Sequence, residues 1–348
     1  MLERIKNKID LELKKFAVDI EKTYSLSKIS PLLFKSIKEF ILRKGKRIRP
    51  ILFIAGYLGF ARKVVPGLYR SALAIELLHD FMLVHDDIID KSDTRRGKPS
   101  MHKMLDKPLK SYKNVKFSGQ DLSIVAGDVI YALAIGAFLS IREDRERKER
   151  ALKKFIAAAV YTSSGEFIDL LAGAKSIDQI SREDIYRIYD YKTACYTFST
   201  PLVTGAILAG AGKKEVDKLF KFGIYLGRAF QIKDDILGMF AEEKKIGKST
   251  LSDLQEAKKT LLIWQAYHSG NKRSKNLIKK VFAKNKVTHQ DLLQMRKIIA
   301  DSGSLDYLYR EIHALIRKSQ SLIASSSISR QYKDFLIQYP KNSLSLKI

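Results

Sequence analysis

The sequence contains few residues that break helices or cross-link a chain. Its 348 residues include 1 cysteine, 7 prolines and 19 glycines. The single cysteine, Cys195, excludes an intrachain disulfide and is compatible with a reducing compartment, so we expect a cytoplasmic protein. Few helix breakers and 45% hydrophobic residues together predict a mostly helical chain that is long enough to bury a large core.

Long hydrophobic runs are also missing. The longest clearly apolar run, residues 129–139, is too short to cross a bilayer, and residues 1–16 are charged throughout. We therefore expect neither a signal peptide nor a transmembrane segment.

Acidic residues are outnumbered, because 64 lysines and arginines face 38 aspartates and glutamates and leave a net charge of +26. We interpret most of this charge as solvated helix faces, although a basic surface also favours anionic substrates and weak contact with anionic lipid headgroups. Nucleic-acid binding is the alternative from a different functional class. It requires basic and aromatic residues on one face and leaves the acidic motifs unexplained, so we expect no nucleic-acid partner.

Apolar residues recur at helical intervals over most of the chain, for example at Ala72, Ile75, Leu78 and Met82. No strand pair or hairpin is convincing, and residues 103–120 have the composition of a loop. Length alone favours two domains. The motifs described next must converge on one site, so we predict a single all-α domain over residues 1–348, a helical bundle with a central catalytic cavity.

Two similar aspartate clusters follow apolar helical runs. Asp86, Asp87 and Asp90 form the first cluster, and Asp234 and Asp235 form the second. Carboxylates one turn apart repel each other unless they share a cation. Asp86 and Asp90 are four residues apart on one helix face, which suits Mg²⁺, because this ion takes one or two carboxylates and completes its shell with water and phosphate oxygens. The clusters predict a magnesium site that holds phosphate groups.

Two basic segments lie near the aspartates in the sequence. Residues 45–50 place three cations within four positions, and residues 94–99 follow the first cluster almost at once. The planar fork of arginine matches phosphate oxygens, so arginines beside a metal site indicate an oxyanion clamp.

These motifs resemble the trans-isoprenyl diphosphate synthases in order and spacing. The resemblance is carried by GKRIRP at 45–50, ELLH at 76–79, LVHDDIID at 83–90, RRGKP at 95–99, KT at 192–193, QIKDDILG at 231–238 and GKSTLSDLQEAKKTLL at 247–262. One departure is Gly238, where many members of that family carry a third aspartate. Metal binding at that end is therefore expected to rest on Asp234 and Asp235.

The resemblance implies an isoprenoid synthase-type fold, a homodimer and a Mg²⁺-dependent prenyltransferase. Such an enzyme joins isopentenyl diphosphate, head to tail, to dimethylallyl, geranyl or farnesyl diphosphate. Carried over residue by residue, the metal ligands are Asp86, Asp90 and Asp234, supported by Asp87 and Asp235. The allylic diphosphate would be held by Arg95, Lys192, Lys248 and Lys258. Isopentenyl diphosphate would be held by Lys46, Arg49, His79 and Arg96, with Gly45 allowing a close approach to the backbone. The reacting centre would be lined by Thr193 and Gln231.

Product length is predicted from the residues before the first cluster. Phe81 lies five residues before Asp86, about 7.5 Å along a helix axis, where a ring should stop elongation. Met82 is flexible and should block less completely. A single aromatic residue at these positions resembles the pattern in geranylgeranyl diphosphate synthases, whereas an aromatic pair resembles the pattern in farnesyl diphosphate synthases. We predict geranylgeranyl diphosphate as the product, with farnesyl diphosphate as the alternative. Terpene cyclases and head-to-head synthases are rivals that should lack GKRIRP.

Overall fold

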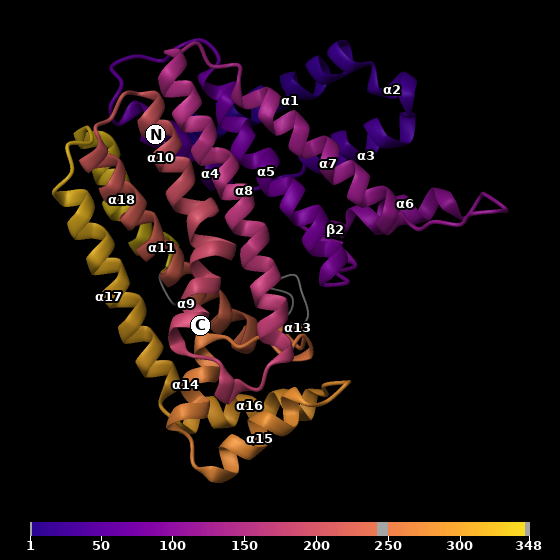
Figure 1. Ribbon diagram of the computed structural model, residues 1–348, viewed down its shortest axis with the longest axis vertical. Coiled ribbons are helices and arrows are strands. Elements are labelled where there is room, and N and C mark those ends of the chain that lie inside the picture. The colour runs from indigo at the N-terminus through magenta and orange to yellow at the C-terminus, as the bar shows by residue number, and fades with distance from the viewer. Residues whose placement is uncertain (1, 242–249, 345–348) are drawn as a thin grey trace. The chain divides into compact units, whose positions relative to one another are not determined.

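The computed structural model describes residues 2–241 and 250–344, apart from the side chain of Asn342. Its elements are almost entirely helical, which confirms the predicted all-α class (Figure 1). The chain divides into two compact units, the first formed by Met1–Phe155 with Thr204–Gly210 and the second by Ile156–Val203 with Ala211–Ile348. The single-domain organisation stays a prediction.

The first unit carries the N-terminal helices and a small hairpin. Its elements are α1 (Leu2–Tyr24), α2 (Leu26–Ile29), α3 (Pro31–Ile41), α4 (Ile48–Leu58), α5 (Leu68–Ile89), β1 (Thr94–Arg95), β2 (Lys98–Pro99), α6 (Met101–Leu109) and α7 (Gly119–Phe138), with the first part of α8 (Arg145–Ala174) and the last part of α10 (Thr200–Leu208). Helix α5 packs against α1, α4 and α7, and α5 and α7 run side by side (Figure 1).

Helix α5 is the central element of this unit. It begins after Gly67, whose φ of 81° is a left-handed conformation that favours glycine. Its residues from Ser71 to Leu78 are all buried, because neighbouring helices cover more than one face. The helix ends at the first aspartate cluster, with Asp90 as its C-cap. A rigid, buried helix thus presents the aspartates at its exposed end.

Two local expectations were wrong. Thr94 pairs with Pro99 and Arg95 with Lys98 in an antiparallel hairpin, whose turn residues Arg96 and Gly97 both have positive φ. Strands of two residues are too short to show alternating hydrophobicity, so the pattern gave no signal. The segment 103–120 is not simply a loop either, because α6 extends into it and buries Met101, His102 and Leu105.

The second unit contains the remaining helices. Its elements are the rest of α8, the 3₁₀ helix η1 (Ile177–Gln179), α9 (Arg182–Ile188), the π-helix η2 (Tyr189–Ser199), the first part of α10, α11 (Lys213–Phe240), α13 (Ser252–Gln255), α14 (Leu261–Ser269), α15 (Lys272–Phe282), α16 (His289–Asp301), α17 (Ser304–Ala324) and α18 (Arg330–Ser343). Helix α11 packs against η2 and α17. A Cβ at Gly227 would lie 2.3 Å from Ala194 Cβ, so this glycine lets α11 approach η2 closely.

Within the part of the chain that the structure describes, two helices, α7 and α8, are long and apolar enough to cross a membrane by length and composition. The apolar stretch of α7 is therefore longer than the run of residues 129–139 that the sequence pattern indicated. Part of that stretch is buried inside the first unit, where α7 packs along α5. A core helix passes the same test of length and composition. The absence of a transmembrane segment stays a prediction.

Candidate active site

The first aspartate cluster separates into one buried and two accessible carboxylates. Asp87 is fully buried, whereas Asp86 and Asp90 are partly exposed at the end of α5. Arg95 of β1 donates from Nε to Asp87 Oδ1 at 2.7 Å, and its NH2 lies 3.4 Å from Asp86 Oδ2. Burial raises the pKa of Asp87 to about 6, although Arg95 opposes this shift. Asp87 thus anchors Arg95, and the accessible pair is left at the surface.

The hairpin turn directs its second arginine to an earlier part of α5. Arg96 NH2 lies 3.2 Å from Asp80 Oδ1 and 3.7 Å from Glu76 Oε1. Asp80 is fully buried, and neither of its carboxylate oxygens has a hydrogen-bond partner of good geometry. Burial raises the pKa of Asp80 to about 7, while the charge of Arg96 lowers it.

The basic segment before α4 faces the same stretch of α5. Arg47 adopts a left-handed conformation at the N-cap of α4, with φ of 53°, and is buried. Its NH1 donates to Glu76 Oε1 at 2.7 Å and its Nε donates to Asp10 at 2.9 Å. Lys46 is exposed, and Gly45 and Arg49 are partly exposed. Lys46 and Arg49, which are predicted to bind substrate, thus lie on either side of Arg47 in the sequence, and Arg47 holds the segment in place.

His79 lies in this basic environment. Burial, and then the charges of Arg49, Arg96 and other arginines, lower the pKa of His79 well below its usual value. The imidazole is therefore neutral at neutral pH, so it can donate a hydrogen bond without adding a charge.

The two predicted chain-length residues lie on α5 before the aspartates. Phe81 packs against His85, with ring centroids 4.6 Å apart, and against Tyr131 of α7, with centroids 5.1 Å apart. Phe81, Met82 and Tyr131 are all partly buried. A second ring therefore supports Phe81 from the neighbouring helix.

The second unit orders its aspartate cluster in the same way. Asp234 is exposed on α11, whereas Asp235 is buried. Tyr189 donates its hydroxyl to Asp235 Oδ2, and Gln231 Nε2 donates to Asp235 Oδ1 at 2.9 Å. Thr193 Oγ1 in turn donates to Gln231 Oε1 at 2.8 Å. Burial raises the pKa of Asp235 to about 8. One chain of hydrogen bonds thus connects Thr193, Gln231 and Asp235.

Two of the lysines that are predicted to bind the allylic diphosphate pair with carboxylates of this unit. Lys192 Nζ lies 2.7 Å from Glu166 Oε2 and 2.8 Å from Asp169 Oδ2. Lys258 Nζ lies 2.7 Å from Glu256 Oε2 and 3.7 Å from Asp253 Oδ1. Lys248 lies outside the described residues.

Comparison with known proteins identifies the family to which a chain with these aspartate clusters and basic residues belongs. The polyprenyl synthetase family matches residues 30–299 of the chain. The chain belongs to the polyprenyl synthetase family. A geranylgeranyl diphosphate synthase from Sulfolobus acidocaldarius is 33% identical over 84% of this chain and 83% of its own length. A geranylfarnesyl diphosphate synthase from Aeropyrum pernix is 31% identical over 85% of this chain and 89% of its own length.

A solved structure has the same fold as this polyprenyl synthetase. The geranylgeranyl pyrophosphate synthase from Corynebacterium glutamicum, solved with isoprenyl diphosphate and magnesium, superimposes with a TM-score of 0.89 and 26% identity over 100% of both chains. The family membership confirms that the chain is a prenyltransferase of isoprenoid biosynthesis. It also accounts for both aspartate clusters, which the nucleic-acid alternative left unexplained.

The accessible carboxylates fit a hard divalent cation. In the first unit Asp86 and Asp90 are partly exposed and Asp87 is hydrogen-bonded to Arg95. In the second unit, taken by itself, Asp234 is exposed and Asp235 is hydrogen-bonded to Gln231. Each unit thus offers accessible carboxylate oxygens. Magnesium prefers such a sparse oxygen set over an all-protein cage. The roles of the individual residues stay predictions.

Several supporting residues of this polyprenyl synthetase were not found from the sequence. They are Asp80, Tyr131, Glu166, Asp169, Tyr189 and Arg43, which donates to the backbone carbonyl oxygens of Arg95 and Pro99 in the hairpin. Asp80 gave a signal, because it follows Glu76 by four residues and lies in the segment between that glutamate and Asp86. Tyr189 precedes Lys192 by three residues, but η2 is a π-helix, so ordinary helical spacing does not predict its direction.

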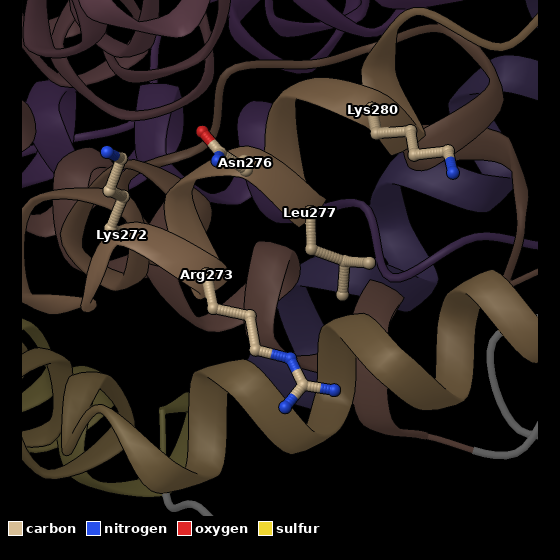
Figure 2. A pocket seen from close by; sticks show the side chains of 5 residues that line it. All are labelled: Lys272, Arg273, Asn276, Leu277 and Lys280. Atoms are coloured by element: carbon tan, nitrogen blue, oxygen red, sulfur yellow. The ribbon is translucent and has the colours of Figure 1, made fainter.

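A surface pocket over α15 contains none of the predicted site residues. Figure 2 shows its lining, formed by Lys272, Arg273, Asn276, Leu277 and Lys280. This lining has no carboxylate for a metal ion and no aromatic wall for a prenyl chain, so the pocket is not part of the candidate active site.

Proposed function

We propose that this polyprenyl synthetase is a short-chain enzyme that joins isopentenyl diphosphate, head to tail, to allylic diphosphates and ends at geranylgeranyl diphosphate. The observation that carries the proposal is the order of residues on α5. Asp86 and Asp90 form its accessible end beside Arg95, and Phe81 lies one turn or more further back against Tyr131. A tail growing from a diphosphate at the aspartates would meet these rings. The name of the Sulfolobus acidocaldarius relative supports the same product.

Magnesium is the proposed cofactor, with Asp86, Asp90 and Asp234 as its ligands. When bound, it would act as a Lewis acid that neutralises charge on the departing diphosphate. Arg95, which Asp87 fixes at 2.7 Å, would bind the allylic diphosphate together with Lys192, Lys248 and Lys258. Gln231 and Thr193, fixed through Asp235, would line the reacting centre.

The second substrate would bind at the basic groups around the middle of α5. Lys46, Arg49 and Arg96 would provide charge, and the neutral His79 would donate a hydrogen bond to isopentenyl diphosphate. The allylic carbon–oxygen bond breaks, the new carbon–carbon bond forms to the isopentenyl double bond, and the released diphosphate takes the proton. No protein base is required.

We further propose a cytoplasmic homodimer. Cys195 is buried and is the one cysteine of the sequence, which is compatible with a reducing compartment. Large apolar side chains on α8 are exposed within the second unit, among them Val160 at 57%, Phe167 at 64% and Leu171 at 53%. Such a stripe supports association with a second copy.

Product analysis tests the proposal. The purified chain would be incubated with isopentenyl and dimethylallyl diphosphates and magnesium, and the alcohols sized by chromatography after phosphatase treatment. Geranylgeraniol as the main product is the expected result, and farnesol would favour the alternative. A twenty-five-carbon alcohol would match the Aeropyrum pernix relative instead. No elongation in the presence of magnesium would overturn the proposal.

A further inference from the structure

The connection between α6 and α7, residues 110–118, is basic and projects away from the other helices of the first unit (Figure 1). We call it the lysine loop, because it carries Lys110, Lys113 and Lys116 and contains no aspartate or glutamate. The three lysines are exposed, and among the residues that the structure describes none of them forms an ion pair. The loop therefore presents positive charge that no carboxylate of the unit neutralises.

Two aromatic side chains of the same loop are exposed. Tyr112 is 65% exposed and Phe117 is 51% exposed. Large rings in contact with water are unfavourable unless a partner covers them, and aromatic rings concentrate at the boundary between the headgroups and the acyl chains of a bilayer. Lysines and exposed rings within one short loop are thus the two signals, charge and apolar contact, that peripheral binding to a membrane combines.

The base of the lysine loop is fixed by carboxylates of α6 and α7. Asp106 Oδ1 accepts from the backbone N–H of Gly119 at 2.7 Å, and a Cβ at Gly119 would lie 2.2 Å from the carbonyl oxygen of His102. Asp121 Oδ2 accepts from the backbone N–H of Ser118 at 2.8 Å and from its hydroxyl at 2.7 Å. Both ends of the loop are therefore held, and the nearby acidic groups are occupied by hydrogen bonds rather than by the lysines.

The loop lies at the same end of the first unit as the accessible aspartates. Helix α7 runs antiparallel to α5, because Ser71 Oγ donates to the carbonyl oxygen of Phe138 at 2.8 Å and a Cβ at Gly127 would lie 2.4 Å from His85 Cε1. About 12 Å of helix separates Gly127 from the start of α7. The loop thus lies beyond the end of α5 that carries the first aspartate cluster.

We propose that the lysine loop is a docking surface for an anionic lipid bilayer, with its lysines among the headgroups and the rings of Tyr112 and Phe117 at the boundary with the acyl chains. The loop contains no arginine, the residue whose planar fork suits the phosphates of nucleic acids, and a net charge of +26 adds long-range attraction to the same surface. Prenyl diphosphates have an anionic head and an apolar tail, so docking would bring the aspartate end of α5 to the surface where they collect. The inference requires a prenyltransferase but no particular product length.

Flotation of the full chain with vesicles tests the proposal. The wild type should float with vesicles of phosphatidylcholine mixed with phosphatidylglycerol and not with phosphatidylcholine alone. Each lysine near an anionic surface contributes about fivefold, so Lys110→Gln with Lys113→Gln and Lys116→Gln should lower the partition coefficient about a hundredfold.

A matched control removes the same charge from another basic surface. Lys272→Gln with Arg273→Gln and Lys280→Gln, on the exposed side of α15, should bind vesicles as the wild type does. Turnover without vesicles should be unchanged in both triple variants, because neither set belongs to the candidate active site.

The aromatic residues are tested separately. Tyr112→Ser with Phe117→Ser keeps the charge, so its remaining binding should be abolished by added salt that the wild type withstands. Phe117→Trp reports contact directly, because its fluorescence should shift to the blue with the anionic vesicles. The wild type, whose one tryptophan is Trp264, supplies the background signal.

Four results would overturn the inference. Equal losses in the two triple variants would show that only the total charge matters, and an unshifted Phe117→Trp spectrum would place the loop outside the lipid interface. A change in sedimentation of the loop variants without vesicles would assign the loop to contact with a second copy. Salt-sensitive DNA retention that the lysine variant loses, in a wild type that does not float, would assign the loop to nucleic acid.

Discussion

Adjacent aspartates in each cluster have different surroundings, and this difference determines what each one contributes. In the first cluster Asp87 is buried against Arg95 and Asp86 is partly exposed. In the second cluster Asp235 is buried against Tyr189 and Gln231, and Asp234 is exposed. Removing a buried aspartate that pairs with another group lowers the free energy of unfolding, whereas removing an accessible aspartate beside like charges changes it little.

Alanine substitutions should separate the two kinds of aspartate. Asp86→Ala or Asp234→Ala should lower the turnover rate on the order of a hundredfold or more, because a group that stabilises transition-state charge is lost, with little change in the free energy of unfolding. Asp87→Ala should cost about 3 kcal/mol of unfolding free energy, because it leaves Arg95 without its buried partner. Steady-state kinetics and urea denaturation measure both effects. Equal stability of Asp86→Ala and Asp87→Ala would contradict this division.

Asp80 should make stability depend on pH. Its pKa is raised from 3.8 to about 7, first by burial. The folded state therefore binds a proton more tightly than the unfolded state, so this residue lowers stability progressively as the pH rises from about 4 to about 7, by at most about 1.4 kcal/mol per pH unit. Urea denaturation of the wild type and of Asp80→Asn across this range should show a stability difference that shifts steadily in favour of the variant. A pH-independent difference would be inconsistent with a titrating Asp80.

At the scale of elements, the hairpin after α5 places both arginines of the RRGKP motif. Arg43, which follows α3, is buried, and it donates to the carbonyl oxygens of Arg95 at 3.1 Å and Pro99 at 2.8 Å. It also pairs with Glu39 at 2.8 Å. A strand pair of two residues is too short to hold itself, so Arg43 fixes the backbone from which Arg95 and Arg96 extend.

Loosening the hairpin should weaken both substrate sites together. Arg43→Gln removes the charge and part of the donor fork, so KM should rise severalfold for the allylic and the isopentenyl substrate alike. Arg96→Ala should instead raise KM for isopentenyl diphosphate selectively, because its contact is local. Initial rates with each substrate varied in turn measure the split. A selective effect of Arg43→Gln would show that the hairpin does not act as one unit.

Helices α5 and α7 should set product length jointly. Phe81 packs on Tyr131 with ring centroids 5.1 Å apart. Phe81→Ala should lengthen the products by at least one isoprene unit, and Tyr131→Ala should do the same because it removes the support of that ring. Tyr131→Phe keeps the ring and is the matched control. Chromatography of the dephosphorylated products would measure the chain lengths made by each variant. An unchanged distribution of product lengths in Phe81→Ala would place the end of the cavity elsewhere.

At the scale of the whole molecule, features that extend over many residues of the sequence could be predicted, and features carried by few residues could not. The all-α class could be predicted, because helical periodicity recurs over most of the chain and the aspartate motifs are long and specific. The hairpin could not, since two-residue strands show no alternation, and neither could the contact of Asp253, on α13, with α11. That contact depends on an empty place at Gly238 and on a helix that lies further along the chain. Close approaches between elements leave no periodic trace in the sequence.

Association is the last property expected of the whole molecule. Two copies that each carry +26 repel one another, so apolar contact must drive any dimer, and added salt should strengthen it by screening. Val160, Phe167 and Leu171 are spaced along one face of α8 and are exposed. Phe167→Glu should therefore convert a dimer to a monomer, measured by analytical ultracentrifugation at low and moderate salt. Ile29→Glu, at a residue 73% exposed on α2, is the matched control and should leave the dimer intact. If both variants sediment as the wild type does, the α8 stripe is not the dimer surface, and binding to anionic vesicles, lost in Phe167→Glu alone, would assign it to a membrane surface instead.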